Sequence, residues 1–115
     1  MLQIASRVEG KLQIMSLTGE VDEGTCTRLA EALEAGSKSL ASHVLLDLHD
    51  LAYINRTGQR IILKHLSLLH RMGRKLIVCQ TRQAVHYAFS ETGLDKVMTI
   101  LPTIQAAKAF IRSHT

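Results

Sequence analysis

Apolar and polar residues alternate in two short segments near the start of the chain, Leu2–Ile4 and Leu12–Leu17. A period of two residues is typical of strands that bury one face. Between them, Glu9-Gly10-Lys11 supplies the residues of a turn. We therefore expect an antiparallel hairpin at the edge of a sheet.

Three later apolar runs have the length of short strands, at 44–48, 76–79 and 97–100. The first two contain nearly continuous aliphatic residues, as do parallel strands that are covered on both faces. Asp47 lies inside the first run and is its only charged residue.

Four segments carry apolar residues at helical spacing. Asp22 and Glu23 sit where a helix N-terminus favours negative charge, and Thr103 is expected to cap the last helix. The expected helices are one that follows Asp22 and stops at Gly36, one from Gly58 to Met72 before Gly73, a short one that ends near Thr92-Gly93, and one after Thr103.

The resulting order is β-β-α-β-α-β-α-β-α. Strands that alternate with helices indicate an α/β fold with a mixed, mostly parallel sheet of four to five strands. A length of 115 residues suits a single domain, 1–115. No apolar segment reaches the length of a membrane span.

The composition of the chain argues against some classes of function and permits others. The chain has two Tyr, two Phe and no Trp, which argues against a single-strand nucleic-acid binder that stacks bases on exposed rings. The net charge of +4 permits an acidic partner without requiring one. Cys26 and Cys79 are far apart and follow no signal peptide, so we expect buried, reduced thiols in a cytoplasmic protein.

Enzyme motifs are missing from the sequence. It contains no phosphate-binding Walker loop, no glycine-rich dinucleotide fingerprint and no nucleophile elbow. His65 and His70 are five residues apart, which places them on different faces of a helix, so we expect surface or half-buried histidines instead of metal ligands. We therefore expect no enzyme activity, no cofactor and no metal.

The segment Asp50–Arg60 is expected to be a loop that leads from the strand at 44–48 into the next helix. Its polar residues Asn55, Arg56, Thr57 and Gly58 lie where ligands and partners bind in an open parallel sheet. In the simpler interpretation, Asn55 or Thr57 is the N-cap of the helix and has no further role. Alternatively, a phosphate on Thr57 would be tolerated at the helix N-terminus and would change the surface charge.

The helix that follows carries Arg60, Lys64 and Arg71 on one stripe, opposite Ile62, Leu66 and Leu69. Such a stripe is either a solvated face or the binding surface for an acidic partner. For Asp47 we expect hydrogen bonds from amides of the loop.

Five segments form a recognisable pattern by their order and spacing: Leu17–Asp22, Val44–Leu48, Tyr53–Gly58, Glu91–Leu94 and Gln105–Ala107. With this pattern the whole chain resembles the STAS domain family, which includes bacterial anti-sigma factor antagonists and the cytosolic tails of sulphate transporters. In that family the loop usually reads Asp-Ser-Ser-Gly, and a partner kinase that is also an anti-sigma factor phosphorylates the second hydroxyl. The resemblance implies that Thr57 is the phosphoacceptor, whereas Asn55 and Arg56 depart from the pattern.

The resemblance implies a non-enzymatic regulatory module of a bacterial cytoplasm, a monomer or weak dimer, that binds an anti-sigma factor kinase. One alternative is a subunit of a phospholipid transport complex that contacts its ATPase, and another is a small-ligand or nucleotide sensor with a pocket near Asp47, Thr57 and Thr81. The expected partner-binding residues besides Thr57 are Asn55, Arg56, Gly58, Arg60, Ile61 and Lys64, with Asp47 and Asp22 supporting the loop.

Overall fold

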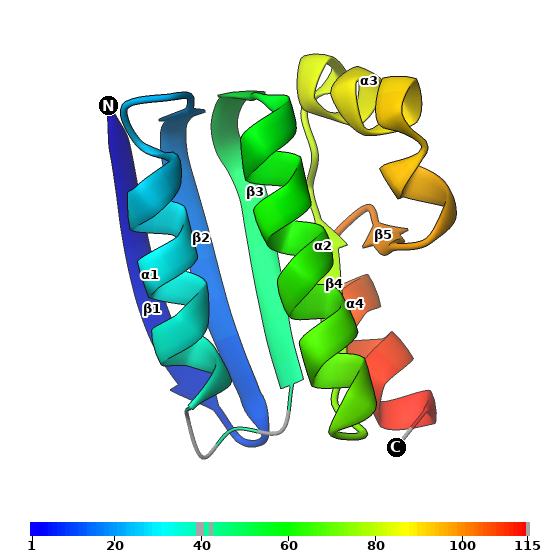
Figure 1. The fold of residues 1–115 in the computed structure, drawn as a ribbon. Coiled ribbons are helices and arrows are strands. Elements are labelled where there is room, and N and C mark those ends of the chain that lie inside the picture. Colours follow the sequence, from blue (N-terminus) through cyan, green and yellow to red (C-terminus); the bar gives the residue numbers. More distant parts are fainter. Residues whose placement is uncertain (39–40, 42, 115) are drawn as a thin grey trace.

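A computed structural model describes residues 1–38, 41 and 43–114, which form one sheet flanked by helices (Figure 1). The order of elements is the one predicted from the sequence, with an additional single 3-10 turn, η1. The elements are β1 (Leu2–Glu9), β2 (Leu12–Val21), α1 (Cys26–Ser37), β3 (His43–Ile54), α2 (Arg56–Arg71), β4 (Leu76–Cys79), α3 (Gln83–Thr92), η1 (Leu94–Lys96), β5 (Thr99–Leu101) and α4 (Ile104–Ser113).

The sheet follows the order of the chain, β1-β2-β3-β4-β5. β1 pairs with β2 in an antiparallel hairpin, and the other neighbours are parallel. The mixed, mostly parallel α/β fold and its antiparallel edge are therefore confirmed. Figure 1 shows α1 and α2 on one face of the sheet, α4 on the other, and α3 near the end of the sheet at which α2 begins.

Two apolar clusters fill the space between the layers. Alternation along β3 sends Leu46 and Leu48 to the face covered by α1 and α2, and Leu45 to the face covered by α4. The first cluster is the larger, because two long helices pack there. The second joins Leu45 to Leu12, Ile14, Ile77 and Cys79 of the sheet and to Ala107 and Ile111 of α4.

β3 is longer than the sequence pattern indicated, so the prediction of a loop over Asp50–Arg60 was wrong. The strand continues to Ile54, where it pairs with Val21 of β2. The pairing of β2 with β3 shifts register between Ser16 and Thr18 and again between Gly19 and Glu20, with one extra residue in β3 each time. These irregularities break the alternation along β3, so a period-two analysis does not detect this half of the strand. Only Asn55 separates β3 from α2.

Helix ends were predicted with mixed success. Gly73 and Gly93 adopt the left-handed conformation that terminates α2 and α3, at φ values of 71° and 79°. Thr103 caps α4, since its Oγ1 accepts a hydrogen bond of 3.0 Å from the amide of Ala106. The stop at Gly36 was wrong, because α1 continues through it and a Cβ there would lie 3.2 Å from the Met15 sulfur.

Two other boundaries differ from the sequence prediction. α1 begins only at Cys26, so Asp22 and Glu23 precede the helix instead of standing in its first turn. β5 begins at Thr99, because Val97 and Met98 belong to the connection that follows η1.

The two cysteines are free but differ in burial. Cys79 is buried in β4, as expected, and burial together with the nearby Asp47 carboxylate raises the pKa of its thiol to about 12. Cys26 is only partly buried at the start of α1, so the expectation that both thiols are buried was wrong for this one.

His43 and His65 are buried, which corrects the expectation of surface or half-buried histidines. His43 Nδ1 accepts a hydrogen bond of 3.0 Å from the amide of Lys75. His65 Nδ1 is buried without a hydrogen-bond partner in the described chain. Burial, and then neighbouring cations, lower the pKa of both imidazoles below the ordinary 6.5.

The first turn of α2 lies against the ends of β2 and β3 at Gly58. A Cβ on this residue would lie 2.5 Å from Val21 Cγ1 and 2.9 Å from Ile54 Cγ1. A side chain there requires the Val21 and Ile54 side chains, or the helix itself, to shift. Glycine at this position therefore sets the distance between α2 and the sheet.

We expect Gly58→Ala to lower the free energy of unfolding. Overpacking of this kind costs about 1–3 kcal/mol, which exceeds the roughly 1 kcal/mol that alanine gains over glycine in a helix. Urea unfolding followed by circular dichroism measures the difference. Gly36→Ala is the matched control, because its Cβ would lie 3.2 Å from the sulfur of the flexible Met15 side chain and 4.0 Å from Gln13 Cγ, an ordinary contact. A Gly58→Ala variant as stable as the Gly36→Ala variant would contradict the packing described here.

Acidification should destabilise the fold through its buried histidines. Because the folded pKa of His43 and His65 lies below 6.5, their stabilising contribution is complete above pH 6.5 and is lost as the pH falls through the folded values. We expect the free energy of unfolding to decrease from pH 7.5 to 5.5. His43→Asn, which keeps an acceptor for the Lys75 amide, should reduce this decrease. An unchanged decrease would show that His43 is not one of the groups responsible.

Candidate functional site

Asn55 connects β3 to α2 with three hydrogen bonds. Its Oδ1 accepts from the amide of Gly58 at 2.8 Å, and its carbonyl accepts from the amide of Gln59 at 3.1 Å. Its own amide donates to the carbonyl of Val21 at 2.9 Å, which ties the junction to the end of β2. Asn55, and not Thr57, is therefore the N-cap of α2.

Thr57 lies in the first turn of α2 with an exposed side chain. Within the part of the chain that the structure describes, its hydroxyl forms no hydrogen bond. The preceding residue, Arg56, is also exposed. The hydroxyl is thus open to solvent at the end of the molecule where α2 begins.

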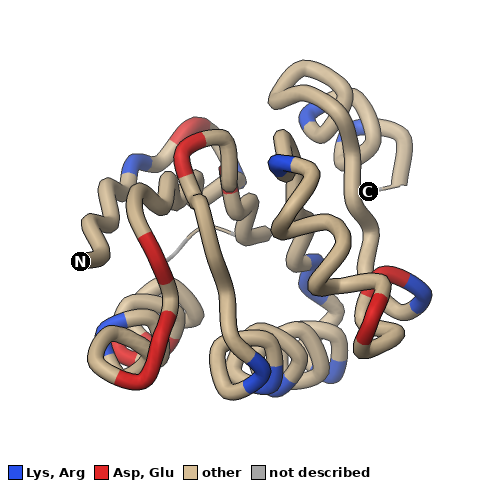
Figure 2. Tube along the Cα trace, turned by 90° about the horizontal axis from the view of Figure 1, so that it is seen from above, with Lys and Arg blue, Asp and Glu red and all other residues tan. Residues whose placement is uncertain are grey.

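Basic side chains follow Thr57 along the exposed face of α2. Arg56, Arg60 and Lys64 recur every four residues, and Arg71 extends the same stripe. Among the described residues none of these four forms an ion pair. Figure 2 shows Lys and Arg gathered on α2, at the lower centre, and Asp and Glu on the segment that leads into α1.

The opposite face of α2 packs into the core, as the sequence pattern predicted. Ile62 and Leu69 are buried and Leu66 is partly buried. Ile61, which was expected to contribute to partner binding, is partly buried against the same core. Gly58 is buried as well, so its contribution is to place the helix.

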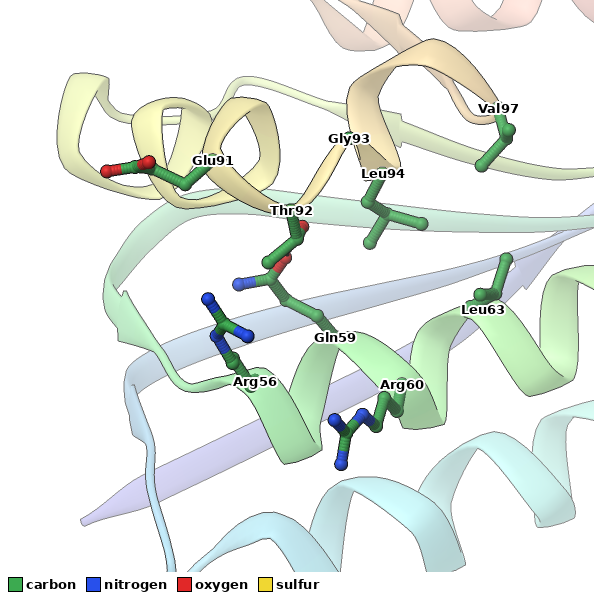
Figure 3. A pocket seen from close by; sticks show the side chains of 9 residues that line it. All are labelled: Arg56, Gln59, Arg60, Leu63, Glu91, Thr92, Gly93, Leu94 and Val97. Atoms are coloured by element: carbon green, nitrogen blue, oxygen red, sulfur yellow. The ribbon is translucent and has the colours of Figure 1, made fainter.

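A groove of about 520 Å³ lies between α2 and the α3–η1 segment, next to this basic stripe (Figure 3). At its base, the Thr92 hydroxyl donates a hydrogen bond of 2.5 Å to Gln59 Oε1 and links the two walls. We call this the α2–η1 groove; its lining residues are Arg56, Gln59, Arg60, Leu63, Glu91, Thr92, Gly93, Leu94 and Val97.

Sequence patterns alone do not predict this groove. In the sequence, Gln59 is an ordinary polar residue of a helix, and Leu63 is one of the apolar residues of that helix. Their partners Thr92 and Val97 come from a segment more than 25 residues later in the chain. Only the packing of α3 and η1 beside α2 brings them together. The pocket expected near Asp47, Thr57 and Thr81 is a different place, because none of these three residues lines the groove.

Asp47 does not support the loop as expected. Its Oδ1 accepts hydrogen bonds from Gln80 Nε2 at 2.8 Å and from the amide of His49 at 3.1 Å. Its Oδ2 accepts from Ser16 Oγ at 3.4 Å. These bonds connect β2, β3 and the residue after β4, and none of them reaches Asn55–Gly58.

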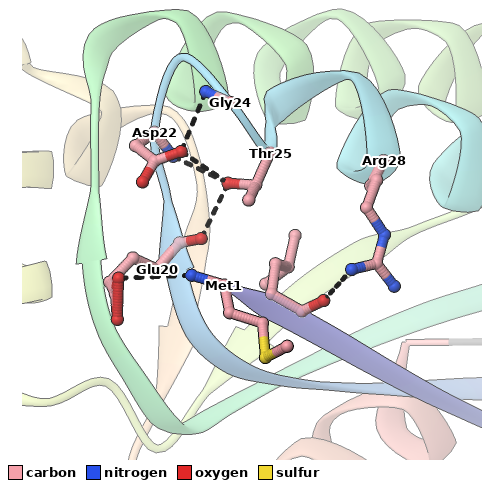
Figure 4. Close-up of polar contacts among 7 residues, drawn as sticks. Met1, Glu20, Asp22, Gly24, Thr25 and Arg28 are labelled. Atoms are coloured by element: carbon pink, nitrogen blue, oxygen red, sulfur yellow. Dashed lines mark hydrogen bonds and ion pairs between the residues drawn. The ribbon is translucent and has the colours of Figure 1, made fainter.

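Asp22 shapes the turn between β2 and α1 (Figure 4). Its Oδ1 accepts from the amide of Gly24 at 2.9 Å and from Thr25 Oγ1 at 3.1 Å. The neighbouring residue, Val21, supplies the carbonyl that binds Asn55. The hydrogen bonds of Asp22 itself stay within the β2–α1 turn, at Gly24, Thr25 and Cys26.

The described residues contain no group of three or more His, Cys, Asp or Glu arranged to hold a metal ion. Within the same residues, no helix is both long and apolar enough to span a membrane.

Similar proteins share this arrangement of elements. An anti-sigma F factor antagonist from Paenibacillus polymyxa is 29% identical over 100 residues, which make up 86% of each chain. The crystal structure of an anti-sigma factor antagonist from Mycobacterium paratuberculosis has a TM-score of 0.89 at 21% identity, covering 97% of this chain and 95% of that one.

The anti-sigma factor antagonist SpoIIAA is similar in two forms. Its unphosphorylated form has a TM-score of 0.78 at 18% identity, with 98% of this chain and 97% of that chain covered. The phosphorylated form of the Bacillus protein has a TM-score of 0.70 at 15% identity, with 96% and 99% covered. At these identities the likeness to the solved structures shows the fold.

The family is settled by the sequence. The STAS domain family model matches residues 3–107, which is nearly the whole chain. This match agrees with the α/β fold and with the resemblance seen in the segments around Thr57. The chain belongs to the STAS domain family.

Proposed function

We propose that this chain is a non-enzymatic anti-sigma factor antagonist that acts in a bacterial cytoplasm. It binds an anti-sigma factor through the N-terminal half of α2, and phosphorylation of Thr57 by that partner weakens the binding. The curated relative from Paenibacillus polymyxa, named as an anti-sigma F factor antagonist, supports the class of function.

The observation that carries this proposal is the exposed Thr57 hydroxyl at the start of a basic, exposed helix. A kinase needs an acceptor that it can reach, and this hydroxyl is free of other bonds in the described structure. The Asn55 cap and Gly58 hold the backbone around it, so the acceptor is presented on a rigid element. That SpoIIAA exists in a phosphorylated form with the same fold supports the modification.

Asn55 and Arg56, which stand where the family loop usually has Asp and Ser, are compatible with this function. Asn55 Oδ1 caps the helix as an aspartate oxygen does, without its charge. Arg60 follows Thr57 by three residues, a spacing that makes the two neighbours on the helix surface, so its guanidinium group can pair with a phosphate on Thr57. Arg56 directly precedes Thr57 and adds a second positive charge at the start of the helix. A phosphate of about −1.5 to −2 charges would therefore neutralise cations that otherwise face the partner.

A second candidate function keeps the same surface without modification. In a STAS subunit of a phospholipid transport complex, Thr57 would serve as a contact to an ATPase subunit. The observation in its favour is the exposed Arg56 beside Thr57, where the phosphorylated family members carry a small serine. An ATPase recovered in place of an anti-sigma factor by affinity purification would favour this candidate.

Thr57 should be the residue that is phosphorylated. We expect incubation with ATP and the anti-sigma factor kinase encoded in the same genome to add one phosphate, because Thr57 is exposed. Intact mass spectrometry measures the gain. Thr57→Ala should abolish it, and Thr27→Ala, which removes an exposed threonine of α1, should not. A phosphate that persists on Thr57→Ala would place the acceptor elsewhere.

Negative charge at position 57 should weaken binding to the anti-sigma factor. Thr57→Glu should weaken binding to the same partner by roughly tenfold, because it adds negative charge to a basic interface. Combined with Arg60→Gln, the same change should have a smaller effect, since one of the cations that it neutralises is already gone. Isothermal titration calorimetry gives the four affinities of this cycle. Equal affinities of Thr57→Glu and wild type would rule out the switch.

A further inference from the structure

The α2–η1 groove extends the proposed binding surface onto a part of the chain that is distant in sequence. Leu63 on α2 is 40% exposed and Val97 after η1 is 62% exposed. Both line the groove, together with Leu94, which is buried beneath it. Two aliphatic side chains are thus presented to solvent on opposite walls of a single depression (Figure 3).

The groove is bordered by cations along its α2 wall. Arg56 and Arg60 line it, neither forms an ion pair in the described chain, and Lys64 continues the stripe. Glu91, on α3, is the only acidic residue of the lining. The border therefore carries a net positive charge, which favours an acidic ligand.

The groove is held in shape before any partner arrives. The Thr92–Gln59 hydrogen bond joins its two walls. Gly93 turns the chain with a φ of 79°, and Leu94 inserts into the core directly after it. Ser90 Oγ donates a hydrogen bond of 3.1 Å to Asp95 Oδ2, which connects α3 to η1. A preformed site of this kind binds without a large ordering cost.

We propose that the groove anchors the anti-sigma factor through an acidic segment that carries one large apolar side chain. The apolar side chain packs between Leu63 and Val97, and neighbouring carboxylates pair with Arg56 and Arg60. This inference rests on the proposed function. It adds the chemistry of the partner segment and assigns part of the interface to the η1 side of the groove, outside α2 and its loop.

The choice of occupant follows from charge and shape together. A nucleic acid would use the basic stripe but would gain little from Val97, and its phosphates would meet Glu91. A second copy of this chain would need an exposed acidic and apolar segment of its own. Binding of a second copy is therefore one of the outcomes of the experiment.

The test compares two valines of similar exposure. Val97→Ser removes the apolar wall of the groove, and Val8→Ser removes a valine that is 57% exposed on β1, at the opposite edge of the sheet. The probe is the purified anti-sigma factor kinase of the same genome, titrated by calorimetry. We expect Val97→Ser and Leu63→Ser each to weaken binding by roughly tenfold and Val8→Ser to leave it unchanged. Circular dichroism verifies that all variants fold.

The results separate this inference from the proposed function. If Thr57→Glu weakens binding while Val97→Ser and Leu63→Ser match wild type, the partner uses α2 without the groove, and only the inference fails. If the wild-type chain binds no anti-sigma factor, both fail. Self-association of the isolated chain that Val97→Ser abolishes would assign the groove to a second copy and overturn the inference. Weaker binding of Val97→Ser and Leu63→Ser but not of Val8→Ser, with affinities that fall at high salt for every variant, supports it.

Discussion

The close contact of Gly58 with Val21 and Ile54 determines where α2 begins, and the exposed surface of the protein depends on it. β3 remains paired with β2 to its last residue, Ile54, and only Asn55 separates it from the helix. Gly58 then lies so close to Val21 and Ile54 that a Cβ on it would collide with their side chains. Asn55 completes the junction by bonding at once to the end of β2 and to the first turn of the helix. As a result, Thr57 stands on a rigid element.

A second consequence of this junction is the division of α2 into two faces. Once the first turn is fixed, the helical period sends Ile62 and Leu69 into the core and Arg60 and Lys64 to the solvent. Cations that repeat every four residues repel one another, and in the described chain none of Arg56, Arg60, Lys64 and Arg71 forms an ion pair that would offset this repulsion. This pattern is understandable if the stripe serves a partner of opposite charge.

Local sequence patterns predicted the order of elements, the antiparallel edge, the caps at Thr103, Gly73 and Gly93, and the basic stripe of α2, because each depends on neighbouring residues alone. They failed where tertiary contacts decide. Irregular pairing with β2 keeps Asp50–Ile54 in a strand, α1 continues one residue past Gly36, and Asp47 bonds to Gln80 instead of the loop. The groove could not be predicted from the sequence for the same reason, since Leu63 and Val97 come to line one groove only in the folded chain.

Hydrogen–deuterium exchange of the chain with and without the anti-sigma factor tests the central claim most directly, because it reports the whole surface in one experiment. The proposed interface predicts slower exchange over residues 56–64 and 91–97, and unchanged exchange at β1. Protection that falls on β1 or α4 and spares both of these segments would contradict it.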